Sequence, residues 1–323
     1  MEVLVSDLPL EPLRLETQYH HRVWGGQRLK PTTPGETPIG EAWLVHEHNR
    51  VQGGRFDGQT LEGVAKHLGA DLLGVNALAR TGTRFPLLIK LLDCADWLSI
   101  QVHPNDAQAV QLEGTGHFGK TEAWHLLEVE PGATLIAGVK PGVSSDALKL
   151  AIRGGTVREV AQYQSVRAGD TVMMAAGTMH ALGPGILLYE VQQTSDLTYR
   201  VYDWDRPASI GRALHIEQSV AVTTIHAASV QHAAPLPATA TQILTECPYF
   251  NLELLQSDGS ATLKGDTRST SFHALTVTAG TADLETAGGR LSLHPYETLI
   301  LPAAQGPYTL RGTCKLLRSS VPG

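Results

Sequence analysis

The sequence predicts a mainly β fold with two related β-barrel halves and a few short helices. Its 323 residues include 32 glycines and 18 prolines, and so many turn formers suit a β-rich fold better than a helical bundle. Residues 85–92 are a short apolar run rich in strand formers, and apolar and polar residues alternate over residues 97–103, as in a strand with one buried face. A weak internal repeat relates residues 166–180 to residues 293–307, since each has a turn, an acid followed by threonine, an apolar run and a second turn.

Composition and charge narrow the classes of function. Hydrophobic residues make up 42% and charged residues 18%, which is ordinary for a soluble globular protein. The net charge of −7, with no basic block, argues against nucleic acid as a partner and gives no reason to expect a membrane surface. Residues 1–15 lack the pattern of a signal peptide, and no apolar stretch is long enough to span a membrane. The unpaired spacing of Cys94, Cys247 and Cys314 favours reduced thiols in a cytoplasmic protein.

The elements of the first half follow from local patterns. The spacing of Leu61, Val64, Ala65 and Leu68 predicts a helix over residues 60–73. A second short helix is expected at residues 106–112. Strands are expected at residues 23–26, 85–92, 97–103, 121–129 and 133–139.

Further along the chain, residues 144–164 are the most helical segment, for which Ser144 or Ser145 is a plausible N-cap. Strands are expected at residues 171–175 and 186–192. Over residues 226–241 the composition changes to Ala, Pro, Thr and Gln, which indicates a linker. Short strands separated by Gly and Asp turns follow it.

Several side chains are of the types that bind metal ions. Alternation along residues 97–103 places Ser99, Gln101 and His103 on one strand face. Glu122 follows Gly119-Lys120-Thr121, and His180 follows a turn at the end of a predicted strand. Such a mixed N/O set suits Zn²⁺, while Mn²⁺, Fe²⁺ and Co²⁺ remain chemically possible. Each short pattern is by itself more often a packing feature, so metal binding gains weight only from the set as a whole.

Longer segments resemble type I mannose-6-phosphate isomerases, in particular the short bacterial form. The resembling segments are residues 85–106, 119–124, 177–182 and 190–206. The resemblance as a whole extends from about Val23 to Val220. It implies two cupin-like (jelly-roll) β-barrel domains. Residues 1–228 would form a catalytic metal-binding domain with a mixed N-terminal segment and a helical insertion at about 144–164. Residues 229–323 would form the linker and a degenerate, metal-free C-terminal domain, since the second repeat has no histidine matching His180.

The resemblance also assigns roles to matching positions. It implies that one divalent metal ion, expected to be Zn²⁺, is held by Gln101, His103, Glu122 and His180. It implies that the phosphosugar site is lined by Ser99 and Lys90, with Glu41 and Trp43 in a nearby segment where strand packing is nearly as good an interpretation. It implies that the catalytic candidates are Lys120, Asp196 and Arg200, near the reacting carbons.

These residue types fit the interconversion of mannose 6-phosphate and fructose 6-phosphate through an enediol(ate), but they leave the base open. A metal ion can stabilise the developing negative oxygen, and a basic group must carry the proton. Lys120 could do so if neighbouring cations and the metal lower its pKa. Asp196 could be the base instead, or could orient Arg200, which stays protonated and suits an oxyanion.

Three alternatives remain. A cupin oxygenase or decarboxylase would favour three histidines, whereas Gln101 with Lys90, Lys120 and Arg200 nearby favours a phosphorylated, redox-inert substrate. A non-catalytic sugar-phosphate-binding protein would not need candidate bases and metal ligands. A glucose 6-phosphate isomerase is the nearest rival within the same chemistry. The expected partner is a small phosphosugar, and the expected state a monomer or weak homo-oligomer.

Overall fold

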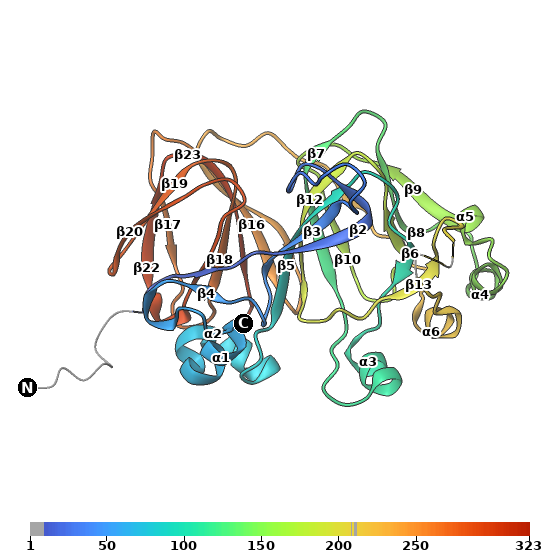
Figure 1. The fold of residues 1–323 in the computed structure, drawn as a ribbon, viewed down its shortest axis with the longest axis horizontal. Helices are drawn as coiled ribbons and strands as arrows, with labels where there is room; N and C mark the ends of the chain where they lie inside the picture. Colours follow the sequence, from blue (N-terminus) through green and yellow to red (C-terminus); the bar gives the residue numbers. More distant parts are fainter. Residues whose placement is uncertain (1–9, 208, 210–211) are drawn as a thin grey trace, which may run out of the picture. The chain divides into compact units, whose positions relative to one another are not determined.

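The computed structural model describes residues 10–207, 209 and 212–323, which form two compact units (Figure 1). Unit 1 contains residues 10–18, 44–87 and 234–323, and unit 2 contains residues 19–43 and 88–233. The domain boundary expected between residues 228 and 229 lies near the last change of unit, between residues 233 and 234, but the other changes of unit were not expected. Residues 10–18 and 44–87 belong with the C-terminal third because two short strands extend its sheet. Strand β1 (Leu13–Leu15) pairs with β21 (Thr298–Leu301), and β4 (Val51–Gln52) pairs with β1.

Unit 2 is built from two β-sheets. In spatial order, the first contains β14 (Val230–Gln231), β10 (Thr171–Met174), β7 (Glu122–Val129), β12 (Ile186–Gln193), β5 (Leu87–Cys94), β2 (Gln18–Gly26) and β3 (Ile39–Val45). The second contains β13 (Tyr199–Tyr202), β6 (Ile100–Val102), β11 (His180–Leu182), β8 (Thr134–Val139) and β9 (Ala161–Ser165). Trp24 and Trp124 of the first sheet share a buried core with Leu135 and Leu182 of the second. The two sheets of the unit therefore pack against each other around a shared core.

Helices pack against the second sheet of unit 2 (Figure 1). They are α4 (Ser145–Arg153), α5 (Val157–Val160) and α6 (Ile216–Val222). The N-cap prediction is confirmed, because the Ser144 side chain accepts a hydrogen bond from the backbone N–H of Ala147 (3.2 Å). The expected continuation of helix to residue 164 is wrong. The chain turns at Gly155, where φ is +71°, and β9 then pairs with β8.

Unit 1 repeats the two-sheet arrangement. Its larger sheet contains β15 (Ala240–Glu246), β16 (Asn251–Asp258), β23 (Thr313–Ser320), β18 (His273–Gly280), β21, β1 and β4. Its smaller sheet contains β17 (Leu263–Asp266), β22 (Pro307–Arg311), β19 (Ala282–Thr286) and β20 (Gly289–Leu293). Leucines from both sheets, including Leu275 and Leu284, form its buried core. Part of the expected linker, residues 230–231, is strand β14 of unit 2, and β15 begins at residue 240.

The remaining helices are short. In unit 1 they are α1 (Leu61–Leu68), α2 (Ala70–Thr81) and the 3₁₀ turns η2 (Gly54–Phe56) and η4 (Ala303–Gln305), and unit 2 adds α3 (Asp106–Glu113). The single helix expected over residues 60–73 is divided at Gly69, where φ is +53°. No helix in the described residues is long and apolar enough to cross a membrane. The prediction of a mainly β fold with a few short helices is confirmed.

Candidate active site

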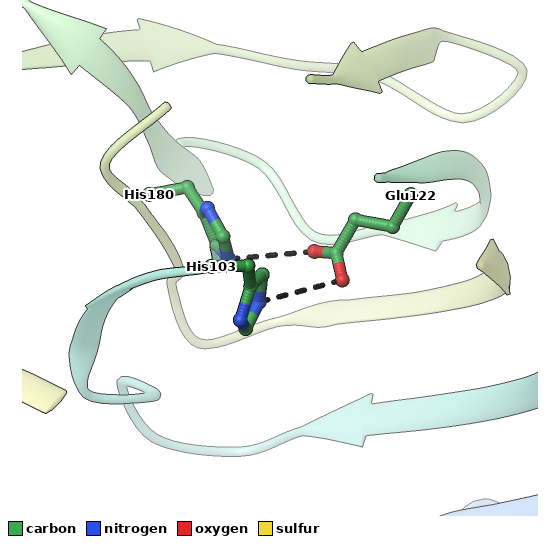
Figure 2. Close-up of side chains that lie close together, drawn as sticks. All are labelled: His103, Glu122 and His180. Carbon is green, nitrogen blue, oxygen red and sulfur yellow. Dashed lines mark ion pairs between the residues drawn. The ribbon is translucent and has the colours of Figure 1, made fainter. Parts of the chain in front are cut away.

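Strands of both sheets in unit 2 bring four of the predicted site residues together. Glu122 begins β7 in the first sheet, whereas His180 begins β11 and Gln101 lies on β6 in the second. The register of the β6–β11 pair places His180 directly opposite Gln101. His103 follows β6, on the same side as Gln101 because side chains alternate along a strand. Figure 2 shows the side chains of His103, Glu122 and His180 pointing toward one another.

The geometry of His103, Glu122 and His180 suits a metal ion. Glu122 Oε2 lies 3.5 Å from His103 Nε2, and Glu122 Oε1 lies 3.3 Å from His180 Nε2. In a tetrahedral site with bonds of 2.0–2.1 Å, ligand atoms lie roughly 3.4 Å apart. Both imidazoles donate from Nδ1 to backbone carbonyls, those of Leu197 and Thr178, at 2.8 Å. Because Nδ1 carries the proton in each neutral ring, the lone pair of each Nε2 points toward Glu122 and can bind a metal.

The protonation states also fit a metal ion. Burial lowers the pKa of His103 and of His180, so both imidazoles are neutral, as metal ligands must be. Burial alone would raise the pKa of Glu122, but the nearby charge of Lys120 outweighs it and the pKa is lowered. Apart from ion contacts, neither carboxylate oxygen of Glu122 has a hydrogen-bond partner in the described part of the chain. Buried acceptors of this kind are costly unless a cation or donor satisfies them.

Gln101 supplies the fourth candidate ligand. Its amide Nε2 lies 3.3 Å from His180 Nε2. A 180° rotation of the amide exchanges its nitrogen and oxygen positions, which would turn the oxygen toward the other three ligands. The donor set of two imidazoles, one carboxylate and one amide therefore fits a divalent ion.

Lys120 is also part of this cluster. Its Nζ lies 2.9 Å from Glu122 Oε2 and 3.1 Å from His103 Nε2. Burial alone would lower the pKa of Lys120, but the carboxylates of Glu122 and Glu190 raise it above its usual value. The condition set for Lys120 as the base, a pKa lowered by neighbouring cations and the metal, is therefore not met by the protein's own charges, because the carboxylates outweigh the cations.

A cavity of about 500 Å³ opens beside the cluster, a size typical of small-molecule sites. Seven of the predicted site residues line it: Glu41, Lys90, Gln101, Lys120, His180, Asp196 and Arg200. Side chains from distant segments of unit 2 therefore line one polar cavity.

The other predicted residues contact this lining. Ser99 Oγ accepts a hydrogen bond from Arg212 Nη2 (3.0 Å). Trp43 Nε1 donates to Glu41 Oε2 (2.7 Å), and Lys90 Nζ lies 5.1 Å from the centroid of the Trp43 ring. Ser99 and Trp43 therefore support the pocket wall, and Trp43 both packs in its strand and holds pocket groups.

Asp196 and Arg200 both face the cavity but do not pair. Arg200 Nη1 donates instead to the carbonyl oxygen of Ala213 (2.9 Å), and no ion pair joins Arg200 to Asp196 among the described residues. The hypothesis that Asp196 orients Arg200 is not supported by this arrangement.

The cavity lining includes residues that the sequence analysis did not single out, among them Glu190 and Arg212. Glu190 is buried, accepts a hydrogen bond from Trp124 Nε1 (3.0 Å) and lies 3.4 Å from Lys90 Nζ. Burial and the Glu122 charge raise the pKa of Glu190. Glu190 lies within residues 190–206, so the resemblance offered a signal for it. Arg212 lies outside a regular element and, although within the range of the resemblance, outside its four characteristic segments, so no motif pointed to it.

Comparison with known proteins agrees with this site. Residues 13–125 match the family model for the phosphomannose isomerase type I catalytic domain, and residues 239–321 match that for the mannose-6-phosphate isomerase cupin domain. The chain is 36% identical to a mannose-6-phosphate isomerase of Streptococcus mutans, covering 96% of this chain and 98% of the relative. It is 32% identical to the mannose-6-phosphate isomerase ManA of Bacillus subtilis, with the same coverage.

The structural comparison leads to the same family. The crystal structure of the mannose 6-phosphate isomerase from Bacillus subtilis matches with a TM-score of 0.82 and 30% identity, covering 96% of this chain and 99% of that chain. The expected cupin fold is thereby confirmed. With this likeness extending over nearly the full length of both chains, the protein belongs to the type I mannose-6-phosphate isomerase family.

Proposed function

We propose that this protein is a metal-dependent aldose–ketose isomerase that interconverts mannose 6-phosphate and fructose 6-phosphate through an enediol(ate). The observation that carries the proposal is the buried group of His103, Glu122 and His180 beside a cavity lined by several cationic side chains. Family membership sets the reaction class, and the site provides the chemistry that this class requires.

The metal ion is proposed to be Zn²⁺, held by His103, Glu122, His180 and the amide oxygen of Gln101. Imidazole and carboxylate donors at near-tetrahedral spacing are typical of zinc sites that keep a position open for water or substrate. A bound divalent ion supplies Lewis-acid stabilisation of a developing oxyanion.

The phosphate group is proposed to bind at Arg212 and Ser99. Three cations of the pocket face nearby carboxylates: Arg22 contacts Glu41, Lys90 contacts Glu190 and Lys120 contacts Glu122. Arg212 Nη1 is buried and makes no hydrogen bond in the described part of the chain, although it lies 3.3 Å from Asp203 Oδ1. A guanidinium with an unused donor is well suited to a phosphate oxygen.

A carboxylate, Glu190 or Asp196, is proposed to carry the proton between C1 and C2. Both line the cavity, and Glu190 Oε1 is buried without a hydrogen-bond partner among the described residues. The Glu122 and Glu190 charges raise the pKa of Lys120, which suits Lys120 better to stabilise negative charge than to accept a proton. Arg200, which also stays protonated, can stabilise the oxyanion from another side.

Substrate specificity tests the proposal directly. Purified protein is assayed for fructose 6-phosphate formation from mannose 6-phosphate, with glucose 6-phosphate and unphosphorylated mannose in parallel. We expect turnover of mannose 6-phosphate alone. Turnover of glucose 6-phosphate would favour the rival isomerase, and no turnover of any sugar by folded, metal-loaded protein would contradict the proposal.

Single substitutions then identify the base. Glu190→Gln and Asp196→Asn each remove one candidate acceptor while nearly keeping side-chain shape. Loss of the true base should lower kcat by about 10²-fold or more with a small change in KM. Equal, small losses in both variants would contradict a carboxylate base and return the role to Lys120.

The cellular setting follows from the same properties. A cytoplasmic location is proposed, in keeping with three cysteines that are all free. The proposed partner is a small phosphosugar and not a nucleic acid or a membrane, in keeping with the net charge of −7. A monomer or weak homo-oligomer is the proposed state.

A further inference from the structure

The turn formed by residues 203–206 holds the segment that leads into Ser99. Trp204 Nε1 donates to the carbonyl oxygen of Leu98 (2.6 Å), and Arg206 Nη2 donates to that of Trp97 (2.7 Å). The rings of Trp204 and Trp97 also pack together, with centroids 4.7 Å apart. Because these contacts fall on the two residues before Ser99, the turn fixes where the Ser99 hydroxyl lies.

The backbone of the turn is strained. Trp204 and Asp205 both have φ of +55°, a left-handed conformation that is unfavourable for residues other than glycine. The Tyr202 hydroxyl donates a hydrogen bond to Asp205 Oδ2 (2.7 Å), which stabilises the left-handed backbone at Asp205. Strain of this kind persists only where surrounding contacts determine the geometry, and it often marks functional sites.

Asp203 connects this turn to the pocket. Its Oδ1 lies 2.9 Å from Arg206 Nη1 and 3.3 Å from Arg212 Nη1, and its side chain is buried. Arg212 in turn lines the cavity and donates to Ser99 Oγ. A single carboxylate therefore contacts both the arginine that anchors the turn and the arginine that faces the cavity.

We infer that Asp203 is a positioning residue, which holds Arg212 against Ser99 so that the pair can bind the phosphate group of the substrate. This inference rests on the proposed function, in which Arg212 and Ser99 receive the phosphate. The alternative is that Asp203 only balances charge. The two roles predict opposite effects, because removing a negative charge near an anion site strengthens anion binding, whereas releasing Arg212 weakens it.

The test compares Asp203→Asn with Asp96→Asn. Asp96 is exposed and accepts a hydrogen bond from Arg206 Nη2 (2.7 Å), so its replacement removes a carboxylate from the same arginine but leaves Arg212 untouched. For both variants and the wild type, KM and kcat are measured with mannose 6-phosphate. The dissociation constant of inorganic phosphate is measured by calorimetry on the metal-loaded protein.

We expect Asp203→Asn to raise KM and the phosphate dissociation constant together, by about tenfold, as for the loss of one charge-assisted contact. The value of kcat should stay within about twofold, and Asp96→Asn should resemble the wild type. Asp203→Glu keeps the charge but displaces it, so a positioning role also raises KM in this variant. It serves as the test if Asp203→Asn proves unstable.

Unchanged or tighter phosphate binding by Asp203→Asn would overturn the inference, as would an equal effect in Asp96→Asn. Failure of the proposed function is distinguishable. A wild type that binds phosphate without isomerising mannose 6-phosphate would refute the proposed reaction. The phosphate dissociation constants of the variants would still test the role of Asp203. A wild type that binds no phosphate would overturn both.

Discussion

Replacing Glu41 by Gln should destabilise unit 2. The Glu41 carboxylate is buried and accepts hydrogen bonds from Arg22 Nε (3.0 Å), Arg22 Nη2 (3.0 Å) and Trp43 Nε1 (2.7 Å). An amide keeps the shape of the side chain but loses the charge, and its NH₂ group would face a donor. The substitution therefore leaves arginine donors in the pocket wall without their acceptor.

The size of the effect follows from the acidity of Glu41. Burial alone raises its pKa, but the charges of Lys90 and Arg22 lower it from 4.5 to about 2. At 1.36 kcal/mol per pH unit this corresponds to about 3 kcal/mol. The Arg22 side chain is 34% exposed, and screening by solvent reduces the expected loss to about 1–2 kcal/mol at pH 7.

Tryptophan fluorescence during urea unfolding measures this loss in unit 2. All five tryptophans of the chain, at positions 24, 43, 97, 124 and 204, lie in that unit. Glu128→Gln is a matched control, since it removes an exposed carboxylate of the same unit that lies 3.7 Å from Arg28 Nη1. The control should change the free energy of unfolding by less than about 0.5 kcal/mol.

The sign of the pH dependence adds a second criterion. A carboxylate whose pKa is lowered in the folded state contributes its full stabilisation above pH 4.5 and loses it as the pH falls toward 2. The gap between wild type and Glu41→Gln should therefore be constant near neutral pH and shrink below pH 4.5. A variant as stable as the wild type at pH 7, or a gap that does not change down to pH 3, would refute the reasoning.

Three further predictions concern single side chains. In unit 1, burial and the Arg318 charge lower the pKa of His273 from 6.5 to about 3, so stability should fall by up to about 1.4 kcal/mol per pH unit below pH 6.5. His273→Gln should flatten this slope in urea unfolding followed by circular dichroism, and an unchanged slope would contradict it. Gly265→Ala would place a Cβ 2.1 Å from Tyr308 Cζ; it should cost about 1–3 kcal/mol, and an unaltered thermal midpoint would count against this packing. Glu122→Gln should weaken zinc retention at least tenfold after dialysis, whereas wild-type metal content would remove Glu122 from the ligand set.

Much of the fold and site could be predicted because their signals are local. Alternation between polar and apolar residues identified the face of β6 that carries Gln101, and Ser144 identified the start of α4. Glu122 and His180 could be found because each lies at a strand end within a segment of characteristic sequence.

What could not be predicted depends on contacts between distant segments. Residues 161–165 continue a helical pattern, but pairing with β8 makes them a strand. The short strand β1 pairs with β21, which is separated from it by most of the sequence. The residues next to β1 in the sequence therefore do not indicate the unit to which it belongs. Arg212 and Glu190 reach the cavity only after folding. The pKa of Lys120, which would have to be lowered for this residue to be the base, is raised by the charges of Glu122, at 2.9 Å, and Glu190.

Metal dependence is the central claim, and one measurement tests it most directly. The rate of fructose 6-phosphate formation from mannose 6-phosphate is measured before chelation, after chelation and after Zn²⁺ is restored, with His180→Asn treated in the same way. The account predicts that chelation abolishes activity, that Zn²⁺ restores it in the wild type, and that the variant stays inactive throughout. Full activity in chelated, metal-free protein would contradict the account.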